Sequence, residues 1–187
     1  MNQQTGLRLP SFFITEPAPC PYLEDQIRAT FTEASDALGY DLWTLCQDGP
    51  AEQLSLTEIT QPLLLTAGVA LFRAWTAAGG AGASFMAGHS LGEYTALTAA
   101  GSLPLADAVR LVRSRGQFMQ EAVPKGVGAM AAVIGLDDTT IESVCAEVAS
   151  ETGLVIEAVN YNAPGQLVIA GHAEAIDASL PRLKEVG

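Results

Sequence analysis

Ser90 is the residue of this sequence whose neighbours point most clearly to chemistry. It lies in the run "MAGHSLGEYTALTAAG", residues 86–101, between Gly88 and Gly92 and directly before a helix-forming stretch. A G-x-S-x-G turn between a strand and a helix permits a tight bend, so the serine hydroxyl projects outward. The helix N-terminus then directs N–H groups at the bond under attack, and the N–H of Leu91 can hold the oxyanion of a tetrahedral intermediate. The pattern indicates a serine nucleophile.

A longer run of sequence around this serine indicates which reaction it takes part in. The run "GHSLGEYTALTAAG" resembles the nucleophile region of the malonyl-CoA:acyl-carrier-protein transacylases, whose mark is GHSxGE. The resemblance extends from about Phe31 to Gly187, in the family's order, through "ASDALGYDLWTL", "TQPLLLTAGVALFRAW", "DAVRLVRSRGQFMQEAVPKGVGAMAAVIGLDD" and "VNYNAPGQLVIAGH". It implies that Ser90 takes malonyl from coenzyme A as an ester and passes it to the phosphopantetheine thiol of acyl carrier protein. The pathway would be fatty acid or polyketide synthesis, with malonyl-CoA as substrate and with no cofactor and no metal.

The resemblance also assigns substrate-binding residues. Arg115, in "RSRGQ", matches the arginine that holds the free carboxylate of malonyl, and a planar guanidinium suits a carboxylate in a way that lysine does not. Asn160 and Asn162, in "NYNAPGQ", match asparagines near the pantetheine entrance. His89 adjoins Ser90, but consecutive side chains on such a bend point apart. We therefore expect a structural or hydrogen-bonding role beside the substrate for His89, and not that of the base.

Helical periodicity predicts the elements that must position Ser90 and Arg115. Apolar residues recur at helical spacing over about 27–38, 60–78, 91–100 and 105–122. We expect Thr60 to cap the second of these helices and Pro62 to lie in its first turn. The short apolar run Ala83–Gly88 predicts a buried strand leading into Ser90. The fourth helix is expected to bury one side, formed by Ala108, Leu111, Val112 and Phe118.

The last third of the chain has a different pattern, in the order strand, helix, strand, strand, helix. The predicted strands are 129–135, 154–160 and 166–171, with a turn over 161–165; Asp137 or Asp138 caps the first helix, and the second begins near Ala173 and is disturbed by Pro181. This order is a split βαβ unit of the ferredoxin type that lacks its closing strand.

The fold class expected for the whole chain is α/β. It combines an incomplete α/β-hydrolase-like large subdomain, which carries the nucleophile elbow, with a ferredoxin-like small subdomain that lacks its last strand. The predicted bounds are 1–22 for an atypical lead-in, 23–125 for the large subdomain and 126–187 for the small one.

Composition and charge narrow the possible partners. The chain has 187 residues and a net charge of −12, which argues against nucleic acid or an anionic membrane as partner. No apolar stretch approaches the ~20 residues that a membrane-spanning helix needs. The N-terminus shows no secretory pattern, and the three cysteines lie far apart, so we expect a cytoplasmic protein. The clustered cations Arg110, Arg113, Arg115 and Lys125 are where an anion or an acidic acyl carrier protein would be received.

Two features of the family are missing, and they leave the activity open. The N-terminal run has no GQGSQ loop, and the family's catalytic histidine and supporting glutamine would fall beyond Gly187. The sequence therefore predicts a truncated transacylase with little turnover, because a serine without a base is a weak nucleophile. One alternative is a non-catalytic fragment that binds malonyl-CoA or carrier protein. The other is an α/β-hydrolase esterase that uses Ser90 with Asp138 and His172.

Overall fold

The structure is a computed structural model that describes residues 21–124 and 126–187. The lead-in expected over 1–22 lies almost wholly outside these residues. The chain divides into two compact units, the first ending at Gln120 and the second running from Glu121 to Gly187. Each unit has its own hydrophobic core.

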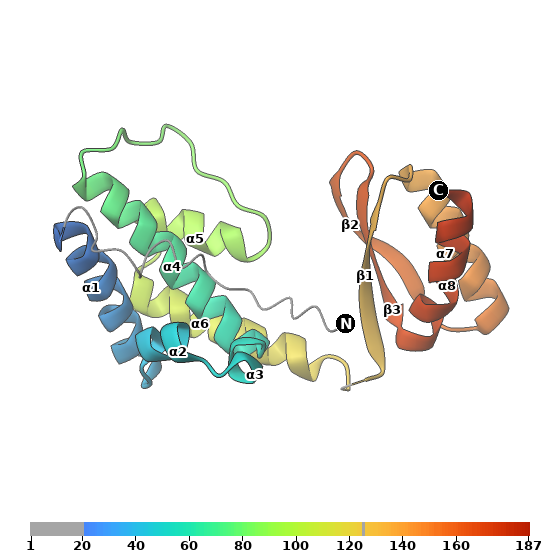
Figure 1. The fold of residues 1–187 in the computed structure, drawn as a ribbon, viewed down its shortest axis with the longest axis horizontal. Helices are drawn as coiled ribbons and strands as arrows, with labels where there is room; N and C mark the ends of the chain where they lie inside the picture. Colours follow the sequence, from blue (N-terminus) through green and yellow to red (C-terminus); the bar gives the residue numbers. More distant parts are fainter. Residues whose placement is uncertain (1–20, 125) are drawn as a thin grey trace. The chain divides into compact units, whose positions relative to one another are not determined.

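The described elements of the first unit are helices, the last of which ends at Glu121, the first residue of the second unit (Figure 1). They are α1 (Pro21–Leu38), α2 (Leu42–Asp48), α3 (Ala51–Leu54), α4 (Thr57–Ala77), α5 (Leu91–Ala99) and α6 (Leu105–Glu121). The helix predicted from apolar periodicity over about 27–38 is confirmed as part of α1, where Phe31, Ala34 and Leu38 are buried. They pack with apolar residues of α4 and α6, among them Leu65, Val69, Val109 and Val112.

Two glycines allow close helix packing around the predicted nucleophile. A Cβ on Gly68 of α4 would lie 2.8 Å from Thr95 Cγ2 of α5, and one on Gly116 of α6 would lie 2.6 Å from Glu58 Cα of α4. A larger side chain at Gly116 would meet backbone and require movement of a helix, and one at Gly68 would require the Thr95 side chain to move. The absence of side chains at these positions brings α5 and α6 against the same helix, α4.

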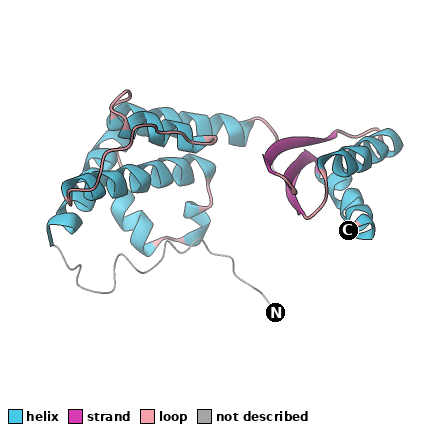
Figure 2. Ribbon diagram, turned by 90° about the horizontal axis from the view of Figure 1, so that it is seen from above, coloured by secondary structure: helices cyan, strands magenta, loops and turns pink. Residues whose placement is uncertain are grey.

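The strand predicted over Ala83–Gly88 is not formed. Residues between α4 and α5 form a loop without regular structure (Figure 2), and Phe85 is 94 % exposed. A strand satisfies its backbone N–H and C=O groups only by pairing with a neighbour, and the described residues of the first unit contain no strand. The prediction of a buried strand at this position is therefore wrong for this chain.

Two details of the predicted helices also change. Helix α4 begins at Thr57, three residues before Thr60, whose hydroxyl donates to Leu56 O at 3.0 Å, so Thr60 does not cap the helix. Pro62 consequently lies further inside the helix than its first turn. In α6, Ala108 and Val112 are buried, but Leu111 and Phe118 are 49 % and 69 % exposed. The apolar side of α6 is thus narrower than its composition predicts.

The second unit is a three-stranded antiparallel sheet with two helices on one face (Figure 1). Its elements are β1 (Gly128–Ile134), α7 (Asp138–Thr152), β2 (Ile156–Ala163), β3 (Gln166–His172) and α8 (Ala173–Val186). Strand β3 lies between β1 and β2 and is antiparallel to both, so β1 and β2 are parallel, as in a split βαβ unit. The core lies between the sheet and the helices and includes Ile141, Val148, Leu167, Ile169 and Ile176.

Local sequence signals predict this unit well. Asp137 is the N-cap of α7, and its carboxylate accepts from Thr140 N at 2.9 Å. Two details differ: β2 extends to Ala163, which shortens the predicted turn, and α8 continues through Pro181 because residues on both sides of it, Ile176 and Leu183, are buried. Helices together with an antiparallel sheet agree with the expected α/β class.

Candidate active site

Ser90 occupies a strained bend at the start of α5. Its backbone has φ 54° and ψ −114°, and among the described residues it is the one non-glycine residue with a positive φ. Such a conformation costs about 1–3 kcal/mol and persists only where its surroundings impose it. A Cβ on Gly88 would lie 2.0 Å from the carbonyl carbon of Gly92 and 2.4 Å from Glu93 N, so the first glycine of the pattern is required by close contact. The tight bend expected at Ser90 is present directly before α5, but no strand leads into it among the described residues.

Arg115 contacts the nucleophile directly. Its Nη2 donates a hydrogen bond to Ser90 Oγ at 2.8 Å, although the two residues are 25 positions apart in the chain. Ser90 is exposed and Arg115 is partly buried on α6. The structure therefore brings together, at an accessible point, the two residues with the most specific predicted roles.

Within the part of the chain that the structure describes, no carboxylate forms an ion pair with Arg115. The ion pairs within the described parts of the chain use Arg28, Arg73, Arg110 and Arg182, and none of them uses Arg115. Its guanidinium carbon lies 5.9 Å from the ring centre of Tyr94, a contact that leaves the positive charge intact. A cation without a counter-ion beside an exposed hydroxyl is suited to receive an anion.

The first turn of α5 supplies a candidate oxyanion donor. Gly92 N donates to His89 O at 2.9 Å and Glu93 N donates to Ser90 O at 3.3 Å, and no acceptor is recorded for Leu91 N among the described residues. An N–H that follows the nucleophile and carries no internal hydrogen bond can stabilise a developing oxyanion.

No proton acceptor contacts Ser90 Oγ within the described residues. Its recorded partner is Arg115, whose guanidinium has N–H donors and no acceptor. His89 is exposed, and the hydrogen bond recorded for it is accepted by its backbone carbonyl. Among the described residues, the geometry shows an exposed hydroxyl beside a cation and shows no base.

The predicted asparagines belong to the second unit. Asn160 lies on β2 opposite Val168 and Asn162 is exposed near the end of the same strand. Val168 lies between the buried Leu167 and Ile169, so Asn160 is on the sheet face opposite the helices. Their proposed proximity to pantetheine stays a prediction.

The acid and base of the esterase alternative lie at opposite ends of the sheet. His172 pairs with Gly128 at one end of β3, whereas Asp138 follows the other end of β1, where Ile134 pairs with Gln166. A strand of this length spans about 20 Å. His172 Nδ1 instead accepts from Val155 N at 3.1 Å, which is a structural role. The predicted Asp138–His172 pair is therefore wrong.

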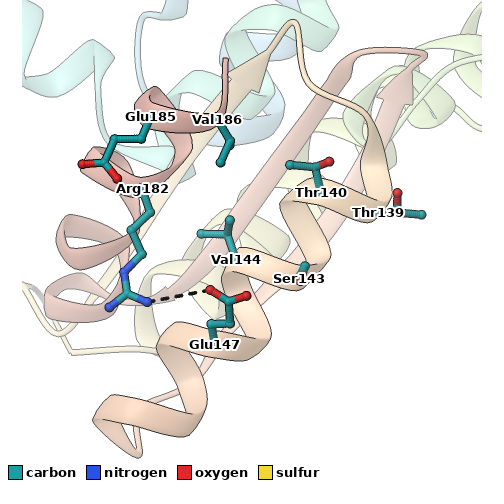
Figure 3. A pocket seen from close by; sticks show the side chains of 8 residues that line it. All are labelled: Thr139, Thr140, Ser143, Val144, Glu147, Arg182, Glu185 and Val186. Carbon is teal, nitrogen blue, oxygen red and sulfur yellow. Dashed lines mark ion pairs between the residues drawn. The ribbon is translucent and has the colours of Figure 1, made fainter.

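A surface hollow lies between α7 and α8 (Figure 3), and its lining residues are distant in the sequence from Ser90 and Arg115. Its basic side chain, Arg182, is already paired: Nη1 lies 3.0 Å from Glu151 Oε1 and 4.0 Å from Glu147 Oε2. The Arg182 hydrogen bond lowers the pKa of the Glu151 carboxyl. The hollow is lined by Thr139, Thr140, Ser143, Val144, Glu147, Arg182, Glu185 and Val186.

No group of three or more His, Cys, Asp and Glu residues in the described parts of the chain could hold a metal ion, and no described helix is long and apolar enough to cross a membrane.

Comparison with known proteins decides the family. Residues 20–187 match the family described as the acyl transferase domain. This chain belongs to that family. The acyltransferase chain is also 59 % identical over 161 residues to the malonyl CoA-acyl carrier protein transacylase of Escherichia coli K12, and 45 % identical over 157 residues to that of Bacillus subtilis. The resemblance to malonyl-CoA:acyl-carrier-protein transacylases is thus confirmed.

Solved structures give the same result. The transacylase of Coxiella burnetii matches with a TM-score of 0.84 and 52 % identity, covering 89 % of this chain and 52 % of that one. A malonyl-transacylase solved in complex with a type II polyketide synthase acyl carrier protein matches with a TM-score of 0.82 and 52 % identity, covering 87 % and 52 %. The curated relatives are covered similarly: 86 % of this chain matches 52 % of the Escherichia coli protein, and 84 % matches 49 % of the Bacillus subtilis protein. The chain spans about half the length of the curated relatives it matches.

Sequence reasoning missed the residues that surround Arg115. Gln61 accepts from Arg115 Nη1 at 2.6 Å, and Met119 Sδ accepts from the same nitrogen at 3.3 Å. A signal for Gln61 was available, because it is a polar residue directly before the apolar run "PLLL" in a core helix. Met119 follows Arg115 at the four-residue spacing that places two side chains on one helix face.

Proposed function

We propose that this chain carries the nucleophile and the carboxylate-binding arginine of a malonyl-CoA:acyl-carrier-protein transacylase. The observation that carries the proposal is the 2.8 Å hydrogen bond from Arg115 Nη2 to Ser90 Oγ on a strained, exposed elbow. Membership of the acyltransferase family and the identity to named transacylases support the substrate, malonyl-CoA, and the acceptor, acyl carrier protein.

Ser90 Oγ attacks the thioester carbonyl carbon of malonyl-CoA in the first half-reaction. The carbonyl oxygen becomes an oxyanion, to which Leu91 N–H donates, and Arg115 holds the distal carboxylate of the malonyl group. The carbon–sulfur bond then breaks, coenzyme A leaves as a thiol with the proton from Ser90, and malonyl stays as a serine ester. The phosphopantetheine thiol of acyl carrier protein reverses these steps in the second half-reaction.

Arg115 gives the reaction its preference for malonyl over acetyl. An acetyl group has no carboxylate, so it would leave the guanidinium without an anionic partner in the acylated site. Malonyl-CoA is a substrate and not a cofactor, and the steps written above call for no metal and no prosthetic group. The absence of a cofactor and the cytoplasmic location both stay predictions.

The proton transfer limits the rate for the chain as described. Since the recorded partner of Ser90 Oγ is a donor, the serine has no base among these residues, and loss of a triad member costs a factor on the order of 10⁴. We therefore propose slow acylation of Ser90 and impaired turnover for the isolated chain.

The finer fold assignment is part of this proposal. The first unit would be part of an α/β-hydrolase-like large subdomain, because it contains the nucleophile elbow, with bounds 23–125. The second would be a ferredoxin-like small subdomain over 126–187, because β3 lies between two parallel strands. Asn160 and Asn162 would line the pantetheine entrance, and His89 would support the substrate site.

A mass-spectrometric experiment tests the reaction. The chain is incubated with malonyl-CoA, the ester is located by peptide mapping, and acyl carrier protein is then added to accept it. We expect one slowly formed malonyl ester on Ser90 that acyl carrier protein removes, and no ester in the Ser90→Ala variant. An ester on another residue, or none after prolonged incubation, would contradict the proposal, and turnover as fast as that of an intact relative would contradict the missing base.

A second candidate function is binding without transfer, and the missing proton acceptor at Ser90 favours it. In that case malonyl-CoA binds stoichiometrically, Ser90 stays unmodified, and the Arg115→Ala variant loses the binding.

Docking of acyl carrier protein has less support from the predicted cation cluster. Arg110 lies 3.5 Å from Asp107, which offsets part of its charge, and the partly buried Arg113 donates to Leu38 O and lies over the Tyr40 ring. Lys125 lies outside the described residues.

A further inference from the structure

The side of the Arg115 guanidinium that does not contact Ser90 is held by two uncharged acceptors. Gln61 of α4 is only 5 % exposed, and its Oε1 accepts from Arg115 Nη1 at 2.6 Å. Met119 Sδ accepts from the same Nη1 at 3.3 Å and from Gln61 Nε2 at 3.4 Å. The two acceptors together use both N–H groups of Nη1.

We infer that Gln61 and Met119 are positioning residues that orient Arg115 for the substrate carboxylate. The inference rests on the proposed function, since it assigns the orientation of the same arginine. With Nη1 occupied and one N–H of Nη2 on Ser90, the donors left are the second N–H of Nη2 and the N–H of Nε. No partner of Nε is recorded among the described residues, and Nε with Nη2 forms the kind of fork that fits a carboxylate.

The chemistry of the two acceptors explains why they suit this position. An arginine side chain has many rotamers, so an unanchored guanidinium would spend little time beside Ser90. A carboxylate in place of Gln61 would anchor it but would also neutralise the charge that the substrate needs. A buried amide needs partners at both ends, and Arg115 and Met119 supply them. The neutral pair orients the cation and leaves its charge available.

Equilibrium binding of two non-transferable coenzyme A thioethers tests the inference without involving a base. S-(2-carboxyethyl)-CoA places a carboxylate at the same chain distance as malonyl, and S-ethyl-CoA lacks it. The ratio of their dissociation constants, measured by titration calorimetry, therefore reports on carboxylate recognition alone. It is measured for the wild type and for the variants Gln61→Leu and Met119→Leu.

Gln117→Leu is the matched control. Gln117 also links α6 to α4, since its Nε2 donates to Glu58 Oε2 at 2.9 Å, but it does not contact Arg115. General loosening of the helix packing would affect Gln117→Leu and Gln61→Leu alike. Met119 is 53 % exposed, so Met119→Leu removes the sulfur acceptor with little risk to folding.

We expect Gln61→Leu to reduce the preference for the carboxylate ligand about tenfold, because a hydrogen bond to a charged group is lost. Met119→Leu should reduce it about threefold, since a thioether is a weaker acceptor, and Gln117→Leu should leave it unchanged. An unchanged ratio in Gln61→Leu, or an equal loss in Gln117→Leu, would overturn the inference. If wild-type Ser90 is acylated by malonyl-CoA while the ratio fails to respond, only this inference falls; if Ser90 is never acylated, the proposed function falls.

Discussion

Two short segments of this chain each contain apolar residues followed by Ala-Gly, but they have different structures. "ASFMAG", residues 83–88, precedes Ser90 and lies exposed in a loop, whereas "QLVIAG", residues 166–171, forms most of the central strand β3. Phe85 in the first segment is 94 % exposed, and Leu167 and Ile169 in the second are fully buried. The difference is that β3 has a partner strand on each side, and the first segment has none among the described residues. An apolar run becomes a strand only where other strands complete its hydrogen bonds.

The largest expected effect is a difference in stability between variants of the two segments. Ile169→Ala removes a fully buried side chain from the core of the second unit and should lower the free energy of unfolding by about 3 kcal/mol. Phe85→Ala removes a larger side chain that is exposed, so we expect almost no change. Urea unfolding of the two variants checks both values, and a comparable loss in Phe85→Ala would show that the 83–88 segment is packed after all.

The next effect concerns labelling of Ser90, because the two glycines of the elbow differ in the space around them. A Cβ on Gly88 would overlap the backbone of Gly92, whereas one on Gly92 meets nothing within 4 Å. Gly88→Ala should displace Ser90 from Arg115 and reduce malonyl labelling of Ser90 by at least about a hundredfold. Gly92→Ala should label within a few-fold of the wild type. Equal effects of the two changes would contradict the bend described here.

Backbone strain at Ser90 predicts a smaller effect, in which a substitution increases the stability of the first unit. Glycine adopts φ 54° readily, so Ser90→Gly should stabilise the first unit relative to Ser90→Ala, by about 1–2 kcal/mol. Both variants lack the hydroxyl, which makes them a matched pair. Thermal unfolding measures the difference, and equal melting temperatures would mean that the elbow relaxes when the chain is in solution.

The smallest effect concerns the N-cap of α7. Hydrogen bonds from the Thr139 and Thr140 hydroxyls and from Thr140 N lower the pKa of the Asp137 carboxyl below its ordinary value of 3.8. A depressed pKa means that the carboxylate stabilises the folded unit fully above that ordinary value and progressively less as the pH falls below it. The Asp137→Ala variant should be slightly less stable at neutral pH and should show a weaker dependence on pH in acid. An identical acid dependence in wild type and variant would exclude this contribution.

The sequence predicts the helices and the second unit well, for a local reason. A helix closes its own hydrogen bonds, so periodicity and caps such as Asp137 are sufficient signals, and the β2–β3 hairpin pairs neighbours in the chain. The 83–88 strand would need partners from distant parts of a chain, and no local signal reports whether they are present. The same limit applies to Leu111 and Phe118, which have suitable spacing on α6 but are 49 % and 69 % exposed among the described residues.

The sequence also predicts only part of the candidate site. Ser90 and Arg115 could be found because a short pattern and a family resemblance mark each of them. Gln61 and Met119 carry weaker signals: the contact of Gln61 with Arg115 depends on the packing of α4 against α6, which Gly116 permits by its lack of a side chain, and Met119 is marked only by its four-residue spacing from Arg115 on α6.

The central claim is that Arg115 selects the acyl group that Ser90 receives. It is tested most directly by the relative rates at which malonyl-CoA and acetyl-CoA label Ser90, in wild type, Arg115→Ala and the control Arg110→Ala. The account predicts a preference for malonyl in the wild type and in Arg110→Ala, and a loss of at least about tenfold in that preference in Arg115→Ala. An unchanged preference in Arg115→Ala, with Ser90 still labelled, would contradict it.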